Sequence, residues 1–93
     1  MALTFEWDPG KARQNLAKHG IDFAEAATVF EDRLSLTIPD PAHSIGEQRF
    51  LTMGISFRRR LVVVAHVDTD GGIRIISARR ASGAERRQYE EGS

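Results

Sequence analysis

The chain has 93 residues, of which 41% are hydrophobic and 28% are charged, and it contains no cysteine. These values indicate a single soluble globular domain over residues 1–93, with one modest core. They exclude a disulfide framework and a Cys-ligated metal site. No apolar run approaches the length of a membrane span, and the N-terminus does not resemble a signal peptide, so we expect a cytoplasmic protein without a membrane partner.

The formal net charge is zero, but the charge is distributed unevenly along the chain. Residues 1–56 carry a net charge of −3 and residues 57–93 a net charge of +3, and all eight basic residues of the second part are arginines. Arginine presents a planar fork of donors that matches phosphate oxygens, so this bias favours phosphate recognition. The codon usage of a GC-rich genome would produce the same bias without any function.

The first third of the chain predicts a strand and two helices. Residues 3–7 alternate between apolar and polar side chains, as in a half-buried strand. Asp8 and Pro9 then supply an N-cap and a proline at the first helical position, and Gly20 supplies the helix end. A second helix is predicted to begin at Asp22, because the apolar residues that follow fall on one face.

The rest of the chain predicts four strands and a closing helix. Strands are expected over residues 34–38, 49–54, 61–67 and 73–77, and a helix over residues 82–91. Asp and Gly residues between 68 and 72 indicate a hairpin turn. The order β-α-α-β-β-β-β-α with short links predicts an α+β fold, in which an antiparallel sheet has helices on one face.

The path from the last strand into the last helix carries Arg74, Ser77, Arg79, Arg86 and Tyr89. Several arginines beside one strand end predict a phosphate-binding surface, and a tyrosine adds a stacking ring and a hydroxyl group. This combination indicates RNA as the ligand. In a regular strand, Arg74 and Arg79 lie on opposite faces because they are five positions apart. They converge only if the strand ends or bulges near residue 78.

These residues also have structural explanations. Arg74 suits an ion pair as well as a phosphate contact, and Tyr89 suits a half-buried ring that seals the helix onto the sheet. Arg86 lies three positions from Tyr89 and shares its helix face, so both side chains could face the last strand. The expected position of Arg79 at the end of the strand favours a functional role.

Lys18 and His19 are candidates for proton transfer, because histidine can donate and accept a proton near neutral pH. Their place at a helix C-terminus also explains them without catalysis, since the helix dipole favours cations there. His43 is a rival candidate in a loop, whereas His66 lies in an apolar strand and suits a core position. The three histidines are dispersed, so we expect neither a metal nor another cofactor.

Blocks of residues along nearly the whole chain resemble one known family. The blocks are Phe5-Glu6-Trp7-Asp8-Pro9, Lys11, Asn15, Lys18-His19-Gly20, Phe23, Glu25-Ala26, Val29-Phe30, Asp40, His43-Ser44, Glu47, Arg49, Arg74-Ile75-Ile76-Ser77-Ala78-Arg79, Glu85-Arg86 and Tyr89-Glu90. In this order they resemble the BrnT-like toxins of bacterial type II toxin–antitoxin systems, within the RelE-like ribonucleases.

The resemblance implies a metal-independent endoribonuclease toxin that inhibits translation. It also implies a small neutralising antitoxin, typically with a ribbon-helix-helix part, and operator DNA bound only by the complex. The residues predicted to act on RNA are Arg79, Arg74, Tyr89, His19 and Lys18 as the catalytic set, with Arg86, Arg58, Arg59, Arg60 and His43 as further RNA contacts. The alternative is a non-catalytic module that uses the same surface to dock an antitoxin and takes part in operator binding.

Overall fold

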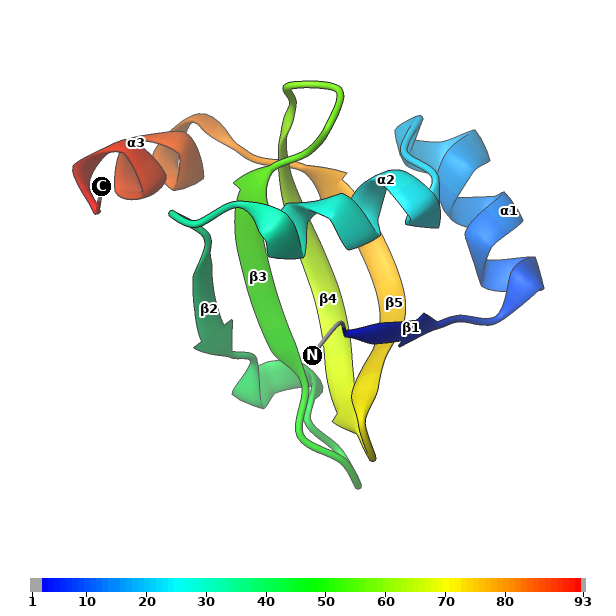
Figure 1. The fold of residues 1–93 in the computed structure, drawn as a ribbon. Coiled ribbons are helices and arrows are strands. Elements are labelled where there is room, and N and C mark those ends of the chain that lie inside the picture. Colours follow the sequence, from blue (N-terminus) through cyan, green and yellow to red (C-terminus); the bar gives the residue numbers. More distant parts are fainter. Residues whose placement is uncertain (1–2, 93) are drawn as a thin grey trace.

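The computed structural model describes residues 3–92, which form a five-stranded sheet and three helices (Figure 1). The elements are β1 (Thr4–Glu6), α1 (Pro9–His19), α2 (Phe23–Thr28), β2 (Leu36–Pro39), β3 (Phe50–Ile55), β4 (Leu61–Thr69), β5 (Gly72–Arg80) and α3 (Gly83–Glu91), with 3-10 turns at Val29–Glu31 and Pro41–His43. The predicted fold class and element order are confirmed. None of the helices within residues 3–92 has the length and apolar character needed to cross a bilayer.

Both N-terminal helices begin at their predicted N-caps, and α1 also ends at its predicted glycine. The side chain of Asp8 accepts a hydrogen bond from the Lys11 backbone N–H at 2.9 Å, and Asp22 accepts one from Glu25 at 2.7 Å. Gly20 ends α1 with a φ of 71°, a left-handed conformation that glycine adopts at little cost. These caps fix the turn between α1 and α2, and thereby the way both helices meet the sheet.

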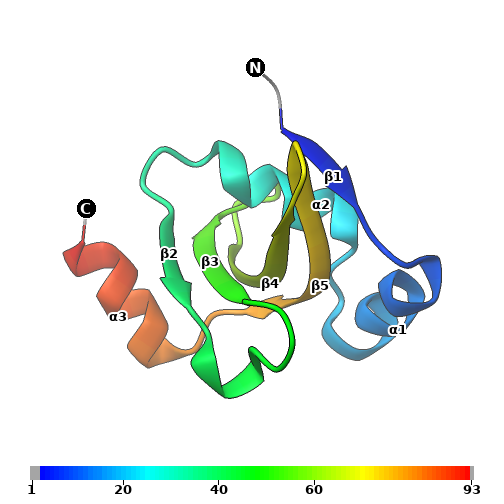
Figure 2. The same cartoon turned by 90° about the horizontal axis from the view of Figure 1, so that it is seen from below.

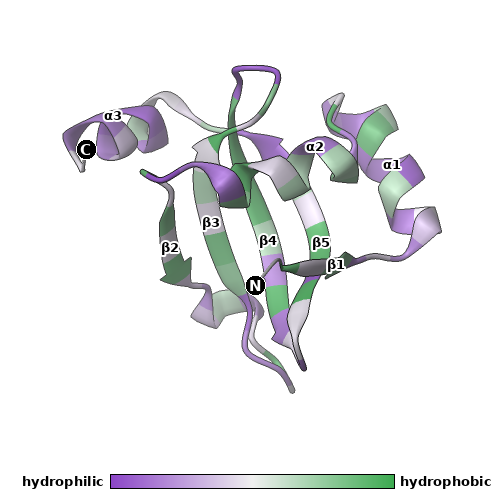
Figure 3. Ribbon diagram, viewed as in Figure 1, coloured by the Kyte–Doolittle hydropathy of each residue, from purple (hydrophilic) through white to green (hydrophobic). Residues whose placement is uncertain are grey.

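The main core lies between the sheet and the first two helices. Its buried residues are Ile21, Phe23, Ala26 and Val29 from the helical segment, and Val62, Val64, Ile73, Ile75 and Ala78 from β4 and β5. Figure 3 shows how apolar residues concentrate in the central strands. Complete burial of a large apolar side chain contributes about 1.5–3 kcal/mol, so this layer is the main source of stability.

The sheet differs from the prediction in the direction of one strand. The strand order is β1-β5-β4-β3-β2, and β1 runs parallel to β5, so the sheet is mixed rather than purely antiparallel. Hairpin links impose antiparallel pairing only from β2 to β5, whereas β1 reaches β5 after a long crossover. In addition, α3 lies at the opposite end of the sheet from α1 (Figures 1 and 2).

The C-terminal helix covers the other face of the sheet. A second apolar cluster of Met53, Leu61 and Val63 lies there, and Tyr89 of α3 packs against it. The prediction of helices on one face is therefore wrong for α3. The reason is that β3 and β4 bury apolar residues on both faces, so one helical layer cannot cover them all.

A β-bulge interrupts the pairing of β4 with β5. Ala65 pairs with Ser77 and His66 pairs with Ile75, so Ile76 is an extra residue on β5. The strand also runs to Arg80, three residues beyond its predicted end. Both features decide where the candidate functional residues point.

Candidate functional site

The bulge at Ile76 brings Arg74, Ser77 and Arg79 onto one face of β5. Arg74 pairs with Val67, Ser77 with Ala65 and Arg79 with Val63, and these three β4 partners alternate by two positions. Directly paired residues in a sheet point to the same side, so the three β5 side chains do as well. Arg74 and Arg79 therefore share one face, as the sequence allowed only if the strand ended or bulged near residue 78. The bulge lies at Ile76, and Arg79 is still within the strand.

This face points away from α1 and α2. Ile75 and Ala78 of β5 belong to the core beneath those helices, so Ser77 and Arg79 face the other side. That side is shared with α3 and the cluster around Val63. The two arginines thus lie on a surface that the main helical layer leaves uncovered.

Arg79 is held by a carboxylate of α3. Its two terminal nitrogens donate to the two oxygens of Glu85 at 2.8 and 3.0 Å, and one of them also approaches the Arg80 carbonyl at 3.4 Å. The hydrogen bonds to Glu85 raise the pKa of Arg79, and the same bonds lower the pKa of Glu85 to about 2. A guanidinium has five N–H donors, so Arg79 keeps two of them for another anion. Its side chain is 44% exposed.

Glu85 is fixed from a second direction. One of its oxygens accepts the Ser82 backbone N–H at 2.8 Å, and the Ser82 hydroxyl accepts the Glu85 N–H, which completes a capping box. The start of α3 therefore sets the position of Glu85, and Glu85 sets the orientation of the Arg79 guanidinium.

Arg74 pairs with Glu47 from the loop between β2 and β3. One terminal nitrogen lies 2.8 Å from both carboxylate oxygens, and both side chains are at least 40% exposed. An exposed pair of this kind contributes little free energy, so an incoming phosphate can replace Glu47. The contact also matches the structural role that the sequence left open for Arg74.

A hollow at the C-terminal end of α1 brings Lys18 and His19 beside Ser77 and Ile76 of β5. Asn15, which lines the same hollow, ties α1 to this strand. Its side chain accepts the Ala78 N–H at 3.0 Å and donates to the Ala78 carbonyl at 2.9 Å, as a neighbouring strand would. Two predicted proton-transfer residues thus lie next to the surface that carries the arginines.

Tyr89 packs from α3 against the sheet, and its hydroxyl group is already bonded. Its hydroxyl donates to Asp32 at 2.5 Å, and burial together with this bond raises its pKa to about 12. The ring packs against the second apolar cluster. This placement matches the sealing role, and a catalytic role for Tyr89 stays a prediction. Arg86 lies exposed on the same helix.

The three arginines of the β3–β4 turn do not share one environment. Arg60 donates to the buried Glu25, which also accepts from the Ser56 hydroxyl at 2.7 Å, and the bond from Arg60 lowers the pKa of Glu25. Arg60 is therefore committed to a structural network. Arg58 and Arg59 are exposed, so RNA contacts remain open to them as predictions.

The other two histidines lie apart from this surface. His43 bonds to Asp40 at 3.0 Å and orders its own loop, while remaining 68% exposed, so its RNA contact stays a prediction. His66 is buried and bonds to the Thr52 hydroxyl at 2.7 Å. Its register partner Ile75 belongs to the core, so His66 points away from the arginines. Within residues 3–92, no group of acidic, His or Cys side chains is arranged to hold a metal ion.

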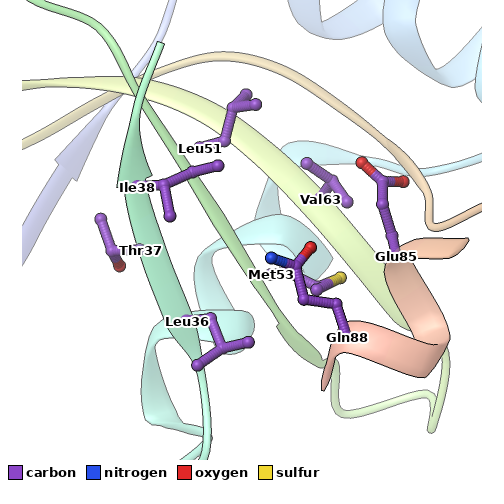
Figure 4. Close-up of a pocket in the computed structure, with 8 residues that line it drawn as sticks. All are labelled: Leu36, Thr37, Ile38, Leu51, Met53, Val63, Glu85 and Gln88. Atoms are coloured by element: carbon purple, nitrogen blue, oxygen red, sulfur yellow. The ribbon is translucent and has the colours of Figure 1, made fainter. Parts of the chain in front are cut away.

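A second hollow lies on the other side of Arg79, between α3 and the sheet (Figure 4). Its lining residues are Leu36, Thr37, Ile38, Leu51, Met53, Val63, Glu85 and Gln88. Sequence reasoning missed it, although the alternation in β2 and β3 places Leu36, Ile38, Leu51 and Met53 on one face. Its wall from α3 could not be foreseen, because the side on which α3 packs is not a local property.

A family model described as "Ribonuclease toxin, BrnT, of type II toxin-antitoxin system" matches residues 7–85. The chain belongs to the BrnT family. The 1.1 Å crystal structure of the ribonuclease toxin BrnT of Brucella abortus is similar, with a TM-score of 0.67 and 25% sequence identity. The similarity covers 87% of this chain and 99% of the Brucella chain. Comparison with curated proteins gave no match.

The family predicted from the residue blocks is thus confirmed, and membership of a toxin–antitoxin family implies an antitoxin partner. The matched BrnT segment contains both arginines of the β5 face and Glu85, but ends before Gln88 and Tyr89.

Proposed function

We propose that this BrnT-family chain is a metal-independent endoribonuclease and that the β5 face is its active site. The observation that supports this best is the bulge at Ile76, which places Arg74, Ser77 and Arg79 on one face. A regular strand would have separated the two arginines. The family description as a ribonuclease toxin supports the same reaction class.

The reaction uses the 2′-hydroxyl group of the RNA itself. The 2′-oxygen attacks the neighbouring phosphorus, so a P–O2′ bond forms and the P–O5′ bond breaks. A base takes the 2′-proton, and an acid protonates the departing 5′-oxygen. The products are a 2′,3′-cyclic phosphate and a 5′-hydroxyl end, and the protein must stabilise the additional negative charge on phosphorus.

In this proposal the arginines hold the phosphate. Arg79 uses the donors that Glu85 leaves free, while Glu85 keeps the guanidinium oriented. Arg74 exchanges its contact with Glu47 for one with a phosphate oxygen. Removal of a donor that stabilises transition-state charge costs about 10²–10³-fold in rate, so a large effect is expected from Arg79.

His19 and Lys18 carry the proton transfers in this proposal, because the hollow they line opens beside Ser77. An imidazole can both accept and donate a proton. Tyr89 is a weaker candidate for the base, because its hydroxyl is already bonded to Asp32 and its pKa is raised to about 12. Cleavage of cellular RNA would inhibit translation, and we propose that a ribbon-helix-helix antitoxin neutralises the toxin and brings operator DNA to the complex.

The test is RNA cleavage in the presence of EDTA by wild type, Arg79→Ala and Arg80→Ala. Arg80 is a matched control because it pairs with Val62 and so belongs to the other face of the same strand. We expect wild type and Arg80→Ala to cleave single-stranded RNA and Arg79→Ala to lose about 100-fold or more in rate. Absence of cleavage by all three proteins, in preparations that bind the antitoxin, would favour the non-catalytic binding module.

A further inference from the structure

We infer that the hollow between α3 and strands β2–β4 holds an RNA base next to the phosphate bound at Arg79, and that Gln88 reads the edge of this base. The inference rests on the proposed function and adds a subsite to it. It concerns the hollow in Figure 4, whose walls come from strands β2, β3 and β4 and from the helix α3.

The size and chemistry of the hollow suit a nucleobase. Its volume is about 190 Å³, well above the roughly 10–15 Å³ that a cavity needs to hold one water molecule. Leu36, Ile38, Leu51, Met53 and Val63 supply a mainly apolar lining. Such a lining favours the apolar surface of a ligand, which gains by leaving water.

The hollow is continuous with the cation that we propose as the phosphate clamp. Val63, which lines it, is the register partner of Arg79 on the neighbouring strand. Glu85 lines it as well and bonds directly to Arg79. A ligand that fits both parts joins an apolar group to an anion, and a nucleotide, with its base and its phosphate, has this composition. An apolar peptide side chain would fill the hollow but leave the free donors of Arg79 without a partner.

Gln88 is the polar group available in the wall. The other two polar side chains are committed, since Glu85 bonds to Arg79 and Thr37 bonds to Thr52 at 2.7 Å. Figure 4 shows the Gln88 side chain extending from α3 over Met53, with its amide toward the middle of the lining residues. An amide offers two donors and acceptor lone pairs, which can match the edge of a base.

The first experiment measures binding without cleavage. Short 2′-O-methyl single-stranded RNAs, which lack the nucleophile, are titrated against wild type, Ile38→Glu and Leu3→Glu. Ile38 is 51% exposed at the hollow, whereas Leu3 is 53% exposed next to β1 at the opposite edge of the sheet, so both substitutions add one charge at a similarly exposed site. We expect Ile38→Glu to weaken binding about tenfold, because its charge repels the nucleotide, and Leu3→Glu to leave it unchanged.

Equal affinities of the two variants would overturn the proposal. It would also be overturned if Ile38→Glu disrupted antitoxin binding while RNA binding stayed normal, because the hollow would then be an antitoxin site. If wild type did not cleave RNA but the two variants still differed in RNA affinity, the proposed ribonuclease activity would be wrong and the base subsite would stand. If wild type cleaved RNA but the two variants bound it equally, only the base subsite would be wrong.

The second experiment tests the role of Gln88 in base preference. Cleavage is compared across four RNAs that differ only in the base beside the cut, with wild type, Gln88→Leu and Gln88→Glu. We expect Gln88→Leu to weaken the preference, since its side chain makes no hydrogen bond. Gln88→Glu should shift the preference toward guanine, because a carboxylate only accepts hydrogen bonds and guanine presents two adjacent donors. The same preference in all three proteins would exclude Gln88 as the reading residue.

Discussion

At the scale of single residues, Asn15 replaces a missing strand. β1 pairs with β5 only as far as Arg74, so the next part of this edge has no strand neighbour. Asn15 satisfies both backbone groups of Ala78 and also donates to the Ile21 carbonyl at 2.9 Å. One buried side chain thus joins α1, the start of α2 and the strand that carries the arginines.

Replacement of Asn15 by alanine is expected to destabilise the fold. It would leave the buried N–H and carbonyl groups of Ala78 without partners, and each unsatisfied group costs about 1–3 kcal/mol. Urea unfolding measures the change, with Gln14→Ala on the exposed side of the same helix as the control. Equal midpoints for the two variants would show that water or a shift of α1 compensates.

Glu85 should contribute to stability in a pH-dependent way. Its pKa is about 2 in the folded protein, held down mainly by Arg79, against an ordinary value of 4.5. Its contribution is therefore present above pH 4.5 and is lost as the pH falls toward 2. Glu85→Gln should unfold with a weaker pH dependence in this window than wild type.

Melting curves at pH 7, 4.5 and 3 measure this effect. Glu91→Gln, on an exposed residue at the end of α3, is the control and should follow the wild-type curve. If the melting temperature of Glu85→Gln changed with pH as steeply as that of wild type, the acid sensitivity would have to come from other carboxylates, such as Asp32, whose pKa is also lowered.

The candidate residues themselves were predictable to different degrees. Arg79 and Arg74 stood out because arginine chemistry can be read from the sequence. Their common face depends on a bulge that forms only when β5 pairs with β4, so no local pattern reveals it. The same limit applies to Glu85 and Gln88, whose roles follow from the face on which α3 packs.

At the scale of elements, the β3–β4 turn carries a conformational cost. Arg59 has a φ of 62°, the one positive value for a residue other than glycine within residues 3–92. The left-handed conformation costs a residue with a Cβ atom roughly 1–2 kcal/mol. The turn closes through hydrogen bonds between Ser56 and the backbone of Arg59 and Arg60.

Arg59→Gly should therefore stabilise the protein by about 1 kcal/mol. Thermal unfolding measures the gain, and Arg58→Gly provides the control because Arg58 has no positive φ. A stabilised Arg59→Gly variant that bound RNA less tightly would support the predicted RNA contact of Arg59. A melting temperature at or below that of wild type would show that the Arg59 side chain stabilises the turn.

Local signals predicted the ends of elements well and their partners poorly. Asp8 and Asp22 mark helix starts through side-chain bonds to nearby backbone N–H groups, and Gly20 marks a helix end through its own N–H, so these local positions were correct. β5 continued beyond Ser77 because Arg79 and Arg80 pair with Val63 and Val62, which is a long-range contact. The parallel pairing of β1 is long-range for the same reason.

At the scale of the whole molecule, the sheet divides two kinds of surface. One face is buried under α1 and α2 and supplies most of the stability, and the other carries the arginines and the hollow beside α3, while the hollow at Lys18 and His19 lies between α1 and β5. Substitutions of exposed residues on the second face can therefore test function with little loss of folding stability. The buried face also contains His66, a titratable group that links the pH to the stability of the core.

His66 should make the fold less stable below neutral pH. It lies between the rings of Phe30 and Phe50, and its Nδ1 atom has no hydrogen-bond partner within the described residues. Burial lowers its pKa below 6.5, and the nearby Asp68 offsets this only in part. As the pH falls, His66 of the unfolded chain therefore binds a proton at a higher pH than His66 of the folded protein. The contribution of the neutral imidazole to folding stability is present above pH 6.5 and is lost as the pH falls through the folded pKa.

The measurement is urea unfolding from pH 8 to pH 5 for wild type, His66→Gln and His43→Gln. Glutamine keeps a donor for Thr52 but does not titrate, so His66→Gln should be less stable than wild type at pH 8 and lose less stability on acidification. His43→Gln, in an exposed loop, should retain the wild-type slope. If His66→Gln and wild type lost stability in parallel, the buried imidazole would have to bind its proton as readily as in the unfolded chain, which its place between two rings argues against.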